Sequence, residues 1–268
     1  MVSQPWTRPE WHATIDSTNT RLLADPTPGA VVVAEHQSAG SGRRGRQWLA
    51  PAGTSLAVSV ALRSPSPDRA GWLPLVAGLA VGRALADHQF ALPTVLKWPN
   101  DVLVPEADVR APAARPAASA ARGGKVCGIL AQASAEVIVL GAGLNIDQRA
   151  DQLPVPEATS WRLALGGTPL PYEVRHSWLT AYLRCLGELV AQLRDDLPAV
   201  VAAYLAQCDT IGRQVQVHLP GGSRSAGVAT GVSHDGALML QTSRGTAIYH
   251  AGDVVHLRPG AAEARLRS

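Results

Sequence analysis

The sequence predicts an α+β protein in which a domain of strands and helices precedes a small C-terminal β-barrel. Up to about residue 209, strand-like apolar runs alternate with segments whose apolar residues recur every three or four positions, as in amphipathic helices. After Thr210 the spacing falls to two, and Gly221-Gly222 and Asp235-Gly236 are typical hairpin turns. We therefore expect one domain over residues 1–209 and a second over 210–268.

The composition is that of an ordinary globular protein. The 268 residues are 46% hydrophobic and 17% charged, enough for one large core or two unequal ones. A net charge of +3 is too small to indicate nucleic-acid binding. The cysteines, Cys127, Cys185 and Cys208, contain no CxxC pair, which favours free thiols in a reducing compartment. Without a leader pattern or a membrane-length apolar run, we expect a cytoplasmic protein that does not contact a membrane.

The first half of the chain predicts four strands and two helices. The strands cover residues 11–15, 31–36, 54–62 and 94–98. Polar residues 16–19 favour the cap of a short helix that ends near Ala24, and small apolar residues predict a longer helix over 72–89. Pro99-Asn100-Asp101 then predicts a turn.

The second half begins with an atypical segment. Residues 105–124 are mostly Ala, Pro and Arg without periodicity, which predicts a flexible insertion between two strands. Strands follow over 125–133 and 136–140, and we expect Gly141-Ala142-Gly143 to end the second one as a turn. Helices are predicted over 159–165 and 172–193, the longer one with a single apolar face.

The most informative segment is the glycine-arginine loop, residues 39–48, with the sequence AGSGRRGRQW. Its glycines permit close backbone approach, and Arg43, Arg44 and Arg46 supply guanidinium groups that bind phosphate or carboxylate oxygens in pairs. Taken alone, the run is more simply interpreted as a solvated basic turn.

Four other segments carry candidate chemistry, and each has a simpler structural interpretation. Ser17-Thr18-Asn19 fits a helix cap as well as a polar contact. Gln37 offers an amide that suits a urea or amide group of a ligand. The run from Lys97 to Asp101 is a specific turn, and Lys125 begins a buried strand, where most lysines are merely solvated. No Walker loop, HExxH or GxSxG motif occurs, and the histidines lack metal-ligand spacing, so we expect no metal-binding residues.

In this order, the segments resemble the catalytic domain of the biotin protein ligases. The matching motifs are STN, EHQ-x-AG-x-GRRGR-x-W, KWPND, GGK-x-x-GIL and GAGLN, between about Ser17 and Trp161. The resemblance implies the mixed sheet shared with class II aminoacyl-tRNA synthetases, followed by an SH3-like barrel. It also implies that ATP and biotin form biotinyl-5′-AMP, from which biotin passes to a lysine of biotin carboxyl carrier protein, a subunit of acyl-CoA carboxylase. Mg²⁺ is implied by the ATP chemistry, with phosphates and waters as its main ligands.

The resemblance also assigns roles to residues. The family's biotin contacts fall on Ser17, Thr18, Asn19, Gln37, Ser41, Gly42, Arg43 and Lys125. Arg43 and Lys125 would neutralise charge as the mixed anhydride forms, and Asp101 would position or deprotonate the acceptor lysine. The remaining expected contacts to biotin or its adenylate are Gly40, Arg44, Gly45, Arg46, Trp48, Lys97, Trp98, Asn100, Gly128, Gly141, Gly143 and Asn145. The glycine-arginine loop would close over the adenylate and exclude water.

Two departures from the family pattern accompany the resemblance. Ser41 stands where many members carry a further arginine. About 16 residues precede Ser17, too few for the DNA-binding domain of some members, so we expect no repressor function and no DNA binding. We expect a monomer or a weak homodimer.

Three alternatives stay open. The nearest is a lipoate protein ligase of the same fold. The second is an acyl transferase with Cys127 as nucleophile. The third is an arginine-rich nucleic-acid-binding module.

Overall fold

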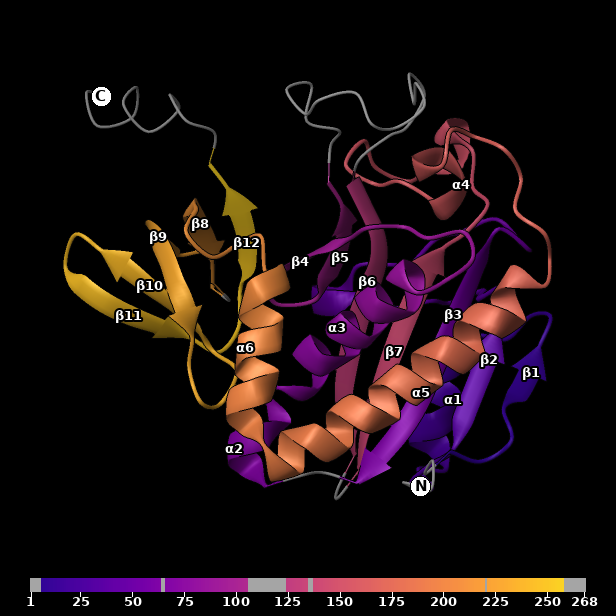
Figure 1. Cartoon of the computed structure of the whole chain (residues 1–268), viewed down its shortest axis with the longest axis horizontal. Coiled ribbons are helices and arrows are strands. Elements are labelled where there is room, and N and C mark those ends of the chain that lie inside the picture. The colour runs from indigo at the N-terminus through magenta and orange to yellow at the C-terminus, as the bar shows by residue number, and fades with distance from the viewer. Residues whose placement is uncertain (1–5, 64–65, 106–123, 135–136, 220, 258–268) are drawn as a thin grey trace.

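A computed structural model describes residues 6–63, 66–105, 124–134, 137–219 and 221–257. The predicted insertion therefore lies almost entirely outside the described residues. The chain forms two sheets, with α6 between them (Figure 1). The helices are α1 (Thr18–Ala24), α2 (Pro67–Ala70), α3 (Leu73–Ala86), α4 (Trp161–Ala164), α5 (Val174–Asp195) and α6 (Leu197–Gln207).

The larger sheet is mixed, as the resemblance to the biotin protein ligases implies. Its spatial order is β1-β2-β3-β7-β6-β5-β4, with β1 and β2 parallel and the other neighbours antiparallel. The strands are β1 (Glu10–His12), β2 (Val31–Ala34), β3 (Ser55–Arg63), β4 (Val95–Lys97), β5 (Asp101–Val104), β6 (Gly124–Ser134) and β7 (Val137–Asn145).

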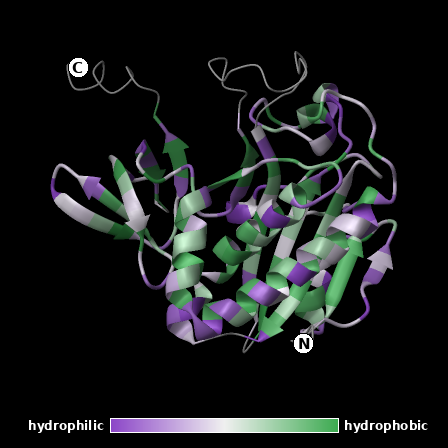
Figure 2. Cartoon of the chain, viewed as in Figure 1, coloured by the Kyte–Doolittle hydropathy of each residue, from purple (hydrophilic) through white to green (hydrophobic). Residues whose placement is uncertain are grey.

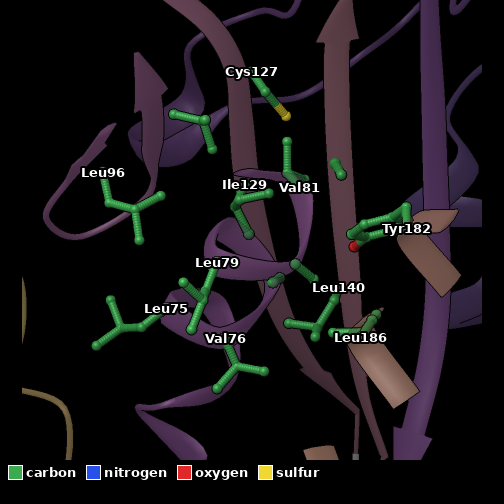
Figure 3. Packing of buried hydrophobic residues seen from close by; sticks show 14 of the residues in the cluster. Leu75, Val76, Leu79, Val81, Leu96, Cys127, Ile129, Leu140, Tyr182 and Leu186 are labelled. Atoms are coloured by element: carbon green, nitrogen blue, oxygen red, sulfur yellow. The ribbon is translucent and has the colours of Figure 1, made fainter. Parts of the chain in front are cut away.

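The two faces of this sheet are covered by different helices. On one face α3 and α5 bury the main core, in which Figure 3 shows Leu79 of α3 and Tyr182 of α5 packed near Leu140 of β7. In Figure 2, α3 is hydrophobic nearly all round, whereas α5 alternates, because only one of its faces meets the core. On the other face Leu22 of α1 packs against Val139. Beyond the start of α1 this second face is covered by no α-helix among the described residues, and the candidate site lies there.

The smaller sheet is antiparallel and has the order β11-β10-β9-β8-β12. Its strands are β8 (Gln214–His218), β9 (Arg224–Val232), β10 (Leu238–Thr242), β11 (Gly245–Tyr249) and β12 (Asp253–His256). Gly222 and Gly236 have φ of 86° and 88° in the turns between strands, so both predicted hairpin turns are confirmed. Strands β11 and β12 lie at opposite edges of this sheet.

The two sheets are joined through buried tryptophans. The indole N–H of Trp72 donates to His234 O at 2.8 Å, and that of Trp98 donates to Gly236 O at 3.1 Å. A Cβ on Gly71 would lie 2.2 Å from Asp235 O, so the β9–β10 hairpin contacts the start of α3 at backbone distance. These contacts fix the smaller sheet beside the segment that carries residues 97–101.

One predicted element is wrong, and three observed elements were not predicted. The turn expected at Gly141-Ala142-Gly143 is wrong, because β7 continues to Asn145 and pairs with β3 along its whole length. Strand β5 and helices α2 and α6 were not predicted. Helix α6 is apolar nearly all round, so it lacks the 3.6-residue periodicity that identifies a surface helix.

Candidate active site

A cavity of about 220 Å³ lies on the open face of the larger sheet. It is bordered by the start of α1, the glycine-arginine loop and the strands β3, β6 and β7. Fifteen of the residues expected from the sequence line it: Ser17, Thr18, Asn19, Gln37, Ser41, Gly42, Arg43, Arg46, Trp48, Asn100, Lys125, Gly128, Gly141, Gly143 and Asn145. The sequence thus predicted most of this lining, although its parts lie up to 128 residues apart in the chain.

One part of the cavity is a buried hydrogen-bond network. Gln37 Oε1 accepts from the backbone N–H and the hydroxyl of Thr18, at 2.8 and 3.0 Å. The Ser59 hydroxyl lies 2.6 Å from Asn19 Oδ1 and 2.7 Å from Thr18 Oγ1. Asn19 Nδ2 donates to Gln132 Oε1 at 2.7 Å. These groups form a rigid polar surface with donors and acceptors already oriented.

The start of α1 explains how three small polar residues serve this network. Ser17 is the N-cap of α1, with extended φ of −157° and a hydroxyl that accepts from Thr20 N–H at 3.4 Å. Thr18 and Asn19 begin the first turn and point toward the sheet, where they are 3% and 5% exposed. The cap and the polar contact, alternatives at the level of sequence, therefore coexist.

The floor of the cavity is built from glycines. Gly141 and Gly143 lie on the cavity face of β7, and Gly128 of β6 pairs with Gly143. A Cβ on Gly141 would lie 2.3 Å from Asn19 Oδ1, and one on Gly143 would lie 2.6 Å from Trp48 Cε2. The missing side chains therefore make the room that Asn19 and Trp48 occupy above the sheet.

A β-bulge brings Lys125 to this floor. The β5–β6 register shifts so that Val102 pairs with Cys127 but Leu103 pairs with Lys125. One extra residue in β6 lets Lys125 and Gly128 share a face, and a Cβ on Gly128 would lie 3.0 Å from Lys125 Nζ. Lys125 Nζ is 2.6 Å from Asp101 Oδ1 and 5.7 Å from the centre of the Trp48 ring.

A second cation faces the cavity from the glycine-arginine loop. Arg43 Nη1 donates to Asn100 Oδ1 at 3.1 Å, and Asn100 Nδ2 donates to Ile129 O at 2.9 Å. Burial lowers the pKa of Arg43 and the Asp253 carboxylate opposes that shift, so the side chain stays cationic in a partly desolvated place. Asn145 is held by Thr159 O and Gln148 Nε2, both at 2.9 Å.

Five residues expected at the ligand do not line the cavity: Gly40, Arg44, Gly45, Lys97 and Trp98. Trp98 is 1% exposed and bonded to Gly236, so it joins the two sheets. Gly40 is needed because a Cβ there would lie 2.6 Å from Trp48 O. Arg44 turns outward to the smaller sheet.

The sequence missed two residues of the polar network, Ser59 and Gln132. Ser59 is a buried polar residue inside an apolar strand, and this contrast was the available signal. Gln132 lies on a half-exposed strand and carried no comparable signal.

The described residues bear on the alternative with Cys127 as nucleophile, on metal binding and on membrane spans. Cys127 is 0% exposed in the main core, on the opposite face from the cavity, and burial raises its pKa to about 12 (Figure 3). A nucleophilic thiolate there is therefore contradicted. In the part of the chain that the structure describes, no three His, Cys, Asp or Glu residues cluster to hold a metal, and no helix is long and apolar enough to cross a membrane.

Family comparison agrees with this architecture. The Biotin/lipoate A/B protein ligase family matches residues 11–147, and the Biotin protein ligase C terminal domain matches residues 210–257. The chain belongs to the biotin/lipoate A/B protein ligase family. Because the C-terminal match is specific to biotin protein ligases, the chain falls in that branch, as the motifs implied.

Individual relatives extend over nearly the whole chain. The biotin–[acetyl-CoA-carboxylase] ligase of Mycobacterium tuberculosis is 40% identical over 262 residues, 94% of this chain and 90% of that protein. The bifunctional ligase/repressor BirA of Escherichia coli is 29% identical over 85% of this chain but only 67% of that protein. The biotin protein ligase from Aquifex aeolicus in complex with biotin and ATP superposes with a TM-score of 0.75 at 26% identity, covering 94% of this chain and 100% of that one.

Proposed function

We propose that the protein joins biotin to ATP as biotinyl-5′-AMP and then transfers biotin to a lysine of a biotin carboxyl carrier protein. The observation that carries this proposal is the cavity's division into two parts. A neutral hydrogen-bond network around Asn19 borders a glycine floor, and two cations, Arg43 and Lys125, lie farther along it. A ligand with a polar neutral head, an apolar chain and a terminal carboxylate fits this order.

The polar network favours biotin over lipoate. The ureido ring of biotin has two N–H donors and a carbonyl acceptor, which match the amides of Asn19 and Gln37 and the hydroxyl of Thr18. The dithiolane ring of lipoate offers these groups neither an N–H donor nor a carbonyl acceptor, and sites built for hydrogen bonds reject such analogues by about 10⁴-fold or more.

The two cations support the first step. A carboxylate oxygen of biotin forms a bond to the α-phosphorus of ATP, and the bond to pyrophosphate breaks. Negative charge grows on the phosphate oxygens and on the leaving pyrophosphate, and Arg43 and Lys125 are already in place to offset it. Trp48, whose buried Nε1 has no partner among the described residues, is assigned to contact the adenine.

The second step needs a neutral amine. The acceptor lysine attacks the acyl carbon, AMP leaves, and the amine gives up a proton; its free pKa is about 10.4. No Asp or Glu lies among the described residues that line the cavity. Asp101 is the carboxylate that contacts the lining residue Lys125. We assign Asp101 to position this amine and to accept its proton.

Mg²⁺ enters with the nucleotide. The described residues provide no cluster of metal ligands, and the Asp101 carboxylate is paired with Lys125. Mg²⁺ prefers to keep waters and to bind substrate phosphates, so we treat the metal–ATP complex as the substrate rather than assigning a resident ion.

The decisive experiment is ATP-dependent transfer of labelled biotin to a purified carrier domain, with lipoate in parallel and a reaction without ATP as control. We expect biotin to be transferred and lipoate to be rejected. Transfer of lipoate at a comparable rate would favour the lipoate ligase instead. The carrier's identity, the monomer or weak homodimer, the domain limits, the cytoplasmic location and the lack of DNA binding stay predictions.

A further inference from the structure

We propose that Asp253 is a positioning residue that holds the glycine-arginine loop over the cavity from the outer side. Asp253 begins β12 in the smaller sheet, more than 200 residues from the loop, and the reaction proposed above makes no use of it. The proposal rests on the role proposed for the loop, but its first test does not require catalysis.

The contacts between the loop and the smaller sheet are made by its three arginines. Arg44 Nη1 donates to Asp253 Oδ2 at 3.3 Å, and Arg46 Nη2 donates to Oδ1 at 3.2 Å. One carboxylate therefore takes one guanidinium on each oxygen. Arg43 Nη1 also lies 3.3 Å from the carbonyl oxygen of the neighbouring Gly252.

The register of the smaller sheet places the acceptors together. Asp253 pairs with His218 across β12 and β8, and the His218 carbonyl accepts from Arg44 Nη2 at 2.8 Å. The Asp253 carboxylate and the His218 carbonyl, which belong to one cross-strand pair, thus bind Arg44 at two points. The pairing of β12 with β8 fixes the carbonyl of His218 and the backbone of Asp253, and the aspartate side chain is short, so its carboxylate has few alternative positions.

The loop needs an external anchor for its conformation. Arg44 has φ of 56° and is the only non-glycine residue with positive φ among the residues described. This left-handed conformation is unfavourable for an arginine, so tertiary contacts must hold it. Within the loop, Gly42 N–H donates to Arg46 O and Trp48 N–H donates to Gly40 O, which closes the loop on itself.

The charges explain why this anchor leaves the loop able to bind an anion. One carboxylate faces three guanidinium groups, so positive charge is left over for a phosphate. Arg43 and Arg46 line the cavity, whereas Asp253 and Arg44 do not. Asp253 therefore holds the loop from the side that faces away from the cavity. The side chains of Arg46 and Asp253 are 64% and 30% exposed, which makes the pairs weak, salt-sensitive and easily opened for ligand exchange.

The test uses Asp253→Asn, which keeps the size of the side chain and removes its charge. Trypsin cleaves after arginine, so cleavage of the ligand-free protein within the loop, followed by mass spectrometry, reports loop opening directly. We expect cleavage after Arg43, Arg44 and Arg46 to become about fivefold faster, as loss of two exposed ion pairs implies. Asp253→Glu should restore most of the protection. Asp195→Asn, which breaks an exposed pair with Arg194 far from the loop, is the matched control and should cleave like the wild type.

Steady-state kinetics separate positioning from a general effect on the fold. In Asp253→Asn we expect the KM for ATP to rise about fivefold with kcat within about twofold and an unchanged melting temperature. Unchanged loop cleavage would overturn the proposal. A lower KM for ATP would also overturn it, because the carboxylate would then be competing with phosphate. Failure of the wild type to transfer biotin would instead contradict the proposed function and leave the cleavage result standing.

Discussion

Gly141→Ala tests the glycine floor of the cavity. The added Cβ would lie 2.3 Å from Asn19 Oδ1, whereas carbon atoms in contact stay about 3.5 Å or more from their neighbours. The Asn19 amide must therefore move by roughly 1 Å. That shift breaks the contacts of 2.6 Å to Ser59 and 2.7 Å to Gln132.

The magnitude follows from the groups that lose their partners. A buried polar group without a partner costs about 1–3 kcal/mol, which corresponds to a rise in the Kd for biotin of roughly 5- to 150-fold. Isothermal titration of biotin measures this directly. Gly231→Ala is the matched control, because Gly231 also lies in a strand and its added Cβ meets nothing closer than Met239 Sδ at 4.0 Å. We expect this control to bind biotin like the wild type.

A double-mutant cycle separates displacement of Asn19 from any other effect of the methyl group. In an Asn19→Ala background the displaced amide is gone, so Gly141→Ala should add little to the loss of affinity. If Gly141→Ala binds biotin normally, or costs the same in both backgrounds, the glycine floor does not act by making room for Asn19.

Three further predictions concern other parts of the molecule. Arg43→Gly should speed release of the adenylate by about tenfold or more, measured by rapid dilution, because a charged hydrogen-bond donor is lost; an unchanged rate would contradict the role given to the loop. Cys127→Ala should leave turnover within about twofold and lower the free energy of unfolding by about 1 kcal/mol; loss of activity would restore the thiol mechanism. Burial lowers the pKa of His256 to about 4, so the neutral ring stabilises the fold above pH 6.5. This contribution, at most about 3 kcal/mol, should disappear as the pH falls from 6.5 to 4, and urea unfolding of His256→Gln should lack that slope.

Short-range signals predicted much of the fold correctly. The polar residues 16–19 predicted the cap of α1, because the N-cap bond of Ser17 joins residues three positions apart. The hairpin turns near Gly222 and Gly236 were equally local, since a positive φ is a property of the glycine itself. The prediction failed at Gly143, whose extended conformation depends on strands on both sides rather than on its own sequence.

The motifs predicted which residues line the candidate site better than they predicted which side chains contact one another. The lining residues were predicted because each motif carries its own residue types, but the pairing of Lys125 with Asp101 depends on a bulge between two strands. The position of Trp98 was also missed, because its burial depends on the docking of the smaller sheet.

Residue order, local spacing and the motifs predicted the α+β architecture, the period-two C-terminal strands and most of the residues that line the cavity. Sheet register and docking determined which of those residues meet: Asn19 with Gln132, and the arginines of the loop with Asp253. The physical reason is chain separation. Hydrophobic periodicity and caps act over a few residues, whereas these contacts join positions more than 100 residues apart, whose meeting depends on the packing of the whole chain.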